Sequence, residues 1–159
     1  MTARKTMTLI LGTAAISLAA SAALAKAYYP SAREMIKGAE FIAVVTLAEP
    51  VKTETHGQWT YLESTDAHLK KQIKGKLPEN FKIQGSENFR CAQCHFPKGE
   101  SIVFLKKDHD LYVGQAWNIS CLPIKSGKVA WFSDLNLRIS DKQSDLSACI
   151  KQIQSEQKD

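Results

Sequence analysis

Residues 89–105, FRCAQCHFPKGESIVFL, decide the fold of this chain. They join a C-x-x-C-H motif, made by Cys91, Cys94 and His95, to the strongest strand signal in the sequence, Ser101–Leu105. A Pro–Gly turn region followed by β-branched and aromatic residues favours an extended strand. The C-x-x-C-H letters are those of a covalent haem attachment site. The rest of the sequence therefore has to discriminate between a small secreted β-barrel and a haem protein.

The N-terminus has the three parts of a secretory signal. Basic residues near the start precede a nearly uncharged apolar run, Met7–Leu24, and small residues follow it. Overlapping A-x-A sites place the cleavage after Ala25 or after Ala27. We expect residues 1–25 to be removed, which predicts a periplasmic or secreted protein with no stable membrane insertion. The alternative is an uncleaved anchor, because the run approaches the ~20 residues that span a bilayer.

The mature chain is expected to be a single domain. Removing 25 of the 159 residues leaves 134, enough for one ordinary core. We place the domain at residues 26–154, with a frayed polar tail at 155–159. The formal net charge of the whole chain is only +5, which does not indicate a nucleic-acid partner. All four cysteines lie in the mature chain, and export favours disulfides.

The mature chain begins with a short helix and then becomes rich in strand signals. Ser31 and Glu34 form a capping box, and Gly38 is expected to end the helix as a left-handed residue. Turn signals and apolar patterns predict strands at 40–47, 59–73, 81–84, 101–105, 111–113, 117–124 and 128–132, with Gly114 between the fifth and the sixth.

The C-terminal part is expected to be a loop followed by a helix. We predict a loop at residues 133–140 and a helix capped by Ser140 or Ser144. Leu146, Ile150 and Ile153 fall at i, i+4 and i+7, which makes one apolar stripe.

Three segments resemble the netrin-like modules, which include the tissue inhibitors of metalloproteinases. Phe41–Leu47 resembles their first strand, Ile73–Gly75 the end of a second, and Phe96–Leu105 their F-x-x-G strand. The resemblance, to a bacterial secreted type, implies a mainly β fold and no specific activity. The fold that the resemblance implies is a five-to-six-stranded OB-like Greek-key barrel with a short N-terminal and a C-terminal helix. The inhibitors use an N-terminal cysteine on the target zinc, but no cysteine precedes Cys91 here.

The cysteines have two interpretations, and the first is structural. In this interpretation two disulfides form from the four cysteines, Cys91, Cys94, Cys121 and Cys149. Each disulfide would stabilise a small exported domain by roughly 2–4 kcal/mol. Pairing Cys91 with Cys94 and Cys121 with Cys149 would clip the turn and tie the last helix to the barrel. The two crossed pairings stay open.

The second interpretation is an exported haem c protein, with Cys91 and Cys94 as thioethers and His95 as proximal ligand. A distal ligand is hard to find, because no methionine follows the motif. The strand after the motif also disfavours the helical surroundings usual for such a haem. We therefore expect no cofactor, and no metal site, because exported thiols oxidise before they bind zinc.

No catalytic residue is assigned from the sequence. The chain has no G-x-S-x-G, H-E-x-x-H or P-loop motif, which favours a non-enzymatic role and leaves an enzyme open. OB barrels bind along one sheet face, which makes Trp59, Tyr61 and Trp117 a candidate ligand face. The sequence predicts an exported, disulfide-stabilised module that binds a protein or an envelope component at the cell surface.

Overall fold

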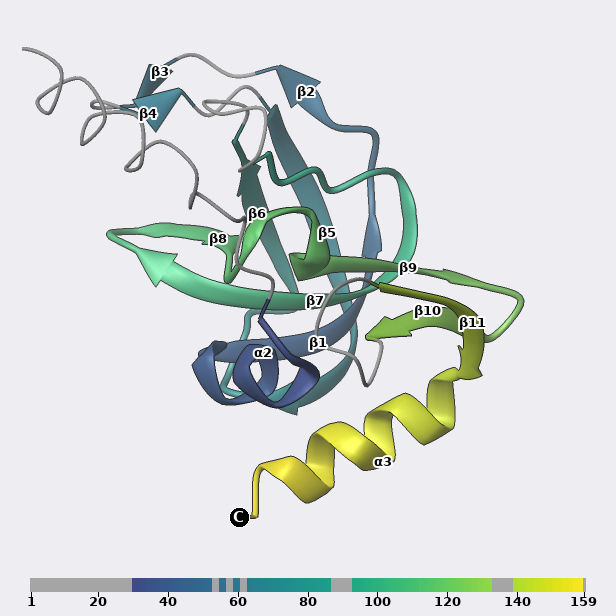
Figure 1. The fold of residues 1–159 in the computed structure, drawn as a ribbon. Coiled ribbons are helices and arrows are strands. Elements are labelled where there is room, and N and C mark those ends of the chain that lie inside the picture. Colours follow the sequence, from purple (N-terminus) through teal and green to yellow (C-terminus); the bar gives the residue numbers. More distant parts are fainter. Residues whose placement is uncertain are drawn as a thin grey trace, which may run out of the picture.

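The computed structural model describes residues 30–52, 55–56, 59–60, 63–86, 93–132 and 139–158. The predicted signal peptide, Tyr61 and Cys91 lie outside these residues. The described part is mainly β, with a closed five-stranded barrel, three further strands beside it and two α-helices (Figure 1). The predicted fold class is confirmed.

The described elements begin and end with a helix. In chain order they are α2 (Ala32–Gly38), β1 (Phe41–Leu47), β2 (Val51–Lys52), β3 (Thr55–His56), β4 (Trp59–Thr60), β5 (Glu63–Lys74), β6 (Asn80–Gly85), β7 (Gly99–Asp108), β8 (Leu111–Gly114), the 3-10 helix η1 (Trp117–Ser120), β9 (Cys121–Lys125), β10 (Lys128–Phe132), β11 (Ile139–Asp145) and α3 (Leu146–Glu156).

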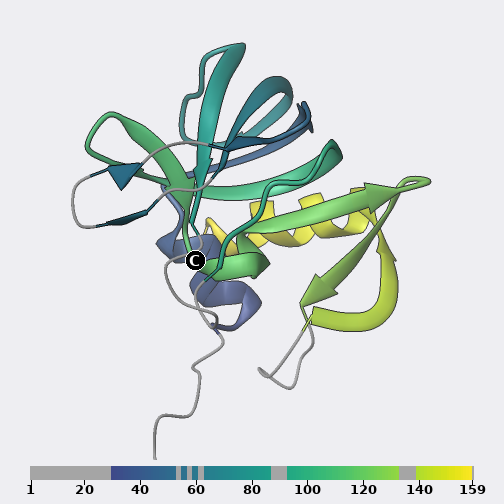
Figure 2. The same cartoon turned by 90° about the horizontal axis from the view of Figure 1, so that it is seen from above.

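The barrel closes because β1 pairs with two neighbours. Its strand order is β1-β5-β6-β8-β7, and β1 is antiparallel to both β5 and β7. The β6–β8 pair is parallel, so the closing step is a crossover rather than a hairpin. Strands β9, β10 and β11 extend the sheet from β7 as an antiparallel ribbon alongside α3 (Figure 2).

β1 is buried on both faces, which explains its almost continuous apolar sequence. Ala43, Val45 and Leu47 face the barrel core, which is the cluster of buried side chains inside the barrel. Strands β1, β5, β6 and β7 each contribute buried residues to this core. Ile42 and Val44 face the outer core, which lies between the sheet and the two helices. Side chains alternate along a strand, so one seven-residue strand holds both cores together.

The two helices cover the same side of the sheet, below the barrel in Figure 1. The predicted capping box of α2 is confirmed: Ser31 N–H donates to Glu34 at 2.7 Å, and Glu34 N–H donates to Ser31 Oγ at 3.2 Å. The helix ends at Gly38, as predicted, but Gly38 is its last helical residue and not a left-handed cap, because the C-cap is extended Ala39. Instead Lys74 Nζ donates to the carbonyls of Ile36 and Lys37, which helix termini leave unpaired.

The C-terminal part differs from the sequence-based expectation. The predicted strand through 117–124 is η1 followed by β9. A strand, β11, occupies residues 139–145, where a loop and a helix start were expected, and α3 begins after Asp145. An edge strand pairs on one side only and needs no alternating apolar pattern, so its polar sequence gave no strand signal.

The predicted apolar stripe of α3 is confirmed. Ile150 and Ile153 are buried in the outer core, and Leu146 packs against it. The helix continues past Ser155 to Glu156, whose carboxylate lies 3.2 Å from Arg33 of α2. Among the described residues, no helix is long and apolar enough to cross a membrane.

Gly75→Ala is expected to destabilise the fold by roughly 3 kcal/mol, against about 1 kcal/mol for the matched control Gly127→Ala. Both glycines have positive φ, +69° and +74°. A Cβ at Gly75 would lie 2.5 Å from the Glu40 carbonyl oxygen, whereas nothing lies within 4 Å at Gly127. Urea unfolding measures both losses. Equal losses would contradict the close approach of the β5 end to β1.

Candidate functional site

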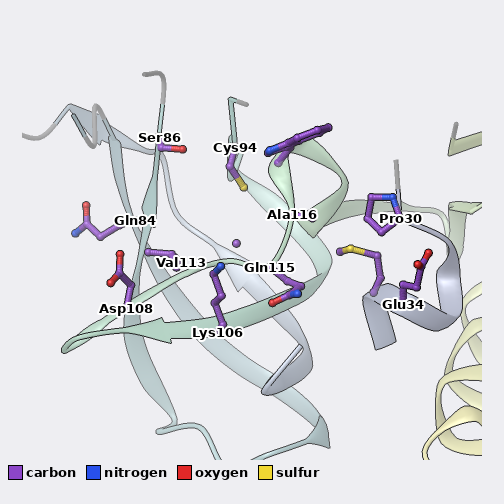
Figure 3. Close-up of a pocket in the computed structure, with 13 residues that line it drawn as sticks. Pro30, Glu34, Gln84, Ser86, Cys94, Lys106, Asp108, Val113, Gln115 and Ala116 are labelled. Atoms are coloured by element: carbon purple, nitrogen blue, oxygen red, sulfur yellow. The ribbon is translucent and has the colours of Figure 1, made fainter. Parts of the chain in front are cut away.

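A pocket of about 490 Å³ opens beside the parallel β6–β8 pair (Figure 3). Residues from α2, β6, β7, β8 and η1 line it, so five separate elements fix its walls. This volume lies within the range of roughly 300–1,000 Å³ that is usual for small-ligand sites. The pocket is therefore large enough for one side chain or head group of a partner.

The pocket walls carry charges of both signs. Lys106 and Asp108 project from β7, and Glu34 projects from α2 on the other side (Figure 3). Buried Met35 and Val113 supply apolar surface between them. The lining thus suits a group with an apolar body and a polar or charged end.

Two site residues that the sequence singled out line this pocket, Trp117 of the predicted ligand face and Cys94 of the C-x-x-C-H motif. Trp59 of the same predicted face lies instead in β4, which pairs with β3 in a separate two-stranded sheet. Lys106 and Asp108 lie beyond the strand predicted at 101–105, but β7 continues through both of them. Their i, i+2 spacing puts both side chains on one face of that strand. This spacing is the sequence signal that could have placed both residues in the same site.

The second half of the C-x-x-C-H motif is extended, not helical. Cys94 makes two backbone hydrogen bonds with Ser86, at 2.9 and 3.2 Å, in an isolated β-bridge. Cys94 is 5% exposed and Phe96 is fully buried, whereas the His95 side chain between them is 39% exposed. This inside–outside–inside order is that of a strand, in which neighbouring side chains point to opposite faces.

Glu63 of β5 holds this segment in place. Its Oε1 accepts the Phe96 backbone N–H at 2.9 Å, and its Oε2 lies 3.3 Å from His95 Nδ1. The Thr65 hydroxyl donates to the Phe96 carbonyl at 3.2 Å. The backbone N–H and C=O of buried Phe96 are therefore both hydrogen-bonded to side chains from one face of β5.

This geometry gives the haem alternative no support. A single porphyrin needs the cysteine sulfurs and the proximal imidazole around one group, but Cys94 is directed inward and His95 is directed to Glu63. Cys94 Sγ packs against Gly114 and Ser120 inside the fold. Cys91 lies outside the described residues, so the absence of a haem stays a prediction.

The described cysteines occupy two different cores. Cys94 and Cys121 belong to the barrel core, and Cys149 belongs to the outer core. All three are free thiols in the structure, so no bridge among these three cysteines is formed there. The sheet lies between Cys121 and Cys149, so a bridge between them would need one of the two to change its face of the sheet.

Burial raises the pKa of all three thiols. The pKa of Cys94 rises to about 12, from burial first and then from nearby Cys121, while a hydrogen bond with Ser120 opposes the shift. Burial raises the pKa of Cys121 and of Cys149 to about 11. These thiols are protonated and unreactive at neutral pH in the folded protein.

Within the described part of the chain, no group of three or more His, Cys, Asp or Glu side chains is arranged to hold a metal ion.

Comparison with known proteins gives no neighbour: no family model, no curated protein and no solved structure matches the chain. The likeness to netrin-like modules therefore depends on the three sequence segments alone.

Glu63→Ala is expected to cost roughly 1–3 kcal/mol, because the buried Phe96 N–H loses its acceptor. Glu63→Gln keeps an acceptor oxygen and is expected to cost less. Glu49→Ala is the matched control, since Glu49 makes only an exposed 3.8 Å pair with Lys98, worth about 0.5 kcal/mol or less. Chemical denaturation compares the three variants. A loss at Glu63 no larger than at Glu49 would refute the role given to this carboxylate.

The fully reduced protein is expected to lose stability as the pH rises from about 9 to about 11. Folding raises the thiol pKa above the unfolded value of 9.0, so the stabilisation is complete below pH 9 and is lost through the folded pKa. Urea midpoints measured in reductant across this range show the decline. A Cys94→Ala variant should decline less, and an identical pH profile in both proteins would count against the raised thiol pKa.

Proposed function

We propose that this chain is an exported, disulfide-stabilised OB-like module that binds a protein or a cell-surface component. The observation that carries the proposal is the pocket beside β6 and β8, with its mixed lining and its volume of about 490 Å³. OB barrels are a fold that binds ligands along one sheet face and its loops. The described residues show no constellation to which we assign a catalytic step.

The pocket lining indicates how a partner would engage. Glu34 and Lys106 lie on different walls, and Met35 is buried between α2 and the sheet. A pocket of this size receives one anchoring group rather than a whole interface. Such anchors carry most of the binding energy when they fill a desolvated pocket, while the surrounding contacts exclude water.

Export is supported by the sequence alone. The apolar run ending at Leu24 and the small residues after it predict a cleaved signal, which places the module in the periplasm or outside the cell. A netrin-like relationship is part of the same proposal, supported by the F-x-x-G strand at Phe96–Leu105.

Filling the pocket is expected to abolish or weaken binding to cell envelopes of the source organism. Ala116 lines the pocket from an extended backbone and is partly buried beside the outer core. Ala116→Phe should raise the dissociation constant at least about tenfold, a loss of roughly 1.4 kcal/mol. Ala148→Phe, on the exposed face of α3, makes the same chemical change away from the pocket and should bind as the wild type does.

The measurement is saturable co-sedimentation of the labelled mature protein with isolated envelopes, after circular dichroism has shown that both variants fold. Saturable binding that only Ala116→Phe weakens supports the proposal. Binding that does not saturate, or that both variants retain equally, contradicts it.

A further inference from the structure

Cys94 and Cys121 lie close together in the barrel core. They are 5% and 4% exposed and belong to the same buried cluster. A Cβ placed on Gly114 would touch Cys94 Sγ and lie 2.9 Å from the Cβ of Ser120, the residue before Cys121. The two cysteines are thus neighbours across the contact between the 93–97 segment and the start of β9.

Cys149 is on the wrong side of the sheet to reach either of them. Cys121 pairs with Val103 in the β7–β9 ladder, and both side chains belong to the barrel core. The next residue, Leu122, belongs to the outer core together with Cys149. A bridge needs Cβ atoms about 3.5–4.5 Å apart, so Cys121 would have to reverse its strand face to meet Cys149.

We propose that Cys94 and Cys121 are the pair that forms a disulfide in this protein. The proposal rests on export in the proposed function, because an oxidising compartment supplies the oxidant. It assigns one of the crossed pairings that the sequence left open and separates Cys94 from its C-x-x-C neighbour Cys91.

The reaction is thiol–disulfide exchange with an exported disulfide carrier. The thiolate of one cysteine attacks the carrier disulfide, giving a mixed disulfide and one carrier thiolate. The second cysteine thiolate then attacks the protein sulfur of that mixed disulfide and releases the second carrier thiolate. The two protons of the protein thiols end on the carrier, which leaves with two thiols. Because both thiols are buried in the folded barrel, the exchange happens before the barrel closes.

The bridge would fix one wall of the pocket. Cys94 lines the pocket, and its sulfur points into it (Figure 3). Linking it to β9 would hold the 93–97 segment against the sheet and close a loop of about 27 residues, which stabilises a protein by roughly 3.5 kcal/mol in the chain-entropy model.

The test is disulfide mapping of the wild-type protein, isolated from its native compartment with free thiols alkylated and then digested with trypsin without reduction. Cleavage after Arg90, Lys98, Lys107 and Lys125 leaves Cys94 in peptide 91–98 and Cys121 in peptide 108–125. We expect these two peptides to be cross-linked. Two matched variants identify the cysteine: Cys91→Ser should keep the cross-link, and Cys94→Ser should lose it.

Any other pairing overturns the inference: Cys121 joined to Cys149, Cys91 joined to Cys94, or a cross-link that Cys91→Ser removes. Protein refolded in a glutathione redox buffer separates this inference from the proposed function. A bridge between Cys94 and Cys121 in refolded protein, with free thiols in native protein, would contradict export and leave the pairing standing. Free thiols or another pairing in both preparations would overturn the pairing itself.

Discussion

The structure depends on the two-sided burial of β1. This strand pairs with β5 on one edge and with β7 on the other, and its two faces supply the two cores. In β1, Ile42 and Val44 pack under the helices, while Val45 and Leu47 fill the barrel. Its neighbour β7 is divided in the same way between the outer core and the barrel core. A one-residue slip of β1 would exchange these faces, so its register is strongly specified.

The register of β1 sets the position of β7 along the sheet, and β7 in turn sets the position of Cys121 at the start of β9. Ser101 pairs with Val45 on one side and with Pro123 on the other, which places β9 and Cys121 at a set position beside the barrel core. The 93–97 segment then reaches the same core through Ser86 and Glu63, with Cys94 inside and His95 outside. The described end of the C-x-x-C-H sequence, Cys94 and His95, thus becomes part of a strand-like support for a pocket wall.

The elements predicted correctly from the sequence are those with an apolar pattern that becomes buried. The elements that were missed are defined only by which strands pair with which. Phe41–Leu47 and Ser101–Leu105 were identified because most of their side chains are apolar and buried on both faces of the sheet, and the capping box identified α2. The polar edge strand β11 carries no such pattern, and the crossover that makes β6 and β8 parallel neighbours is a long-range property. The pocket was missed for the same reason, since Glu34, Gln84 and Lys106 come together only after the barrel closes.

The central claim is that this is an exported module whose cysteines are used for structure and not for haem. Intact mass spectrometry of the native protein tests it most directly. We predict a chain that begins at Lys26 or Tyr28 and is lighter than the fully reduced sequence by two hydrogens for each bridge, with no added group. A mass that includes residues 1–25, retains all thiol hydrogens or is heavier by one haem would contradict the claim.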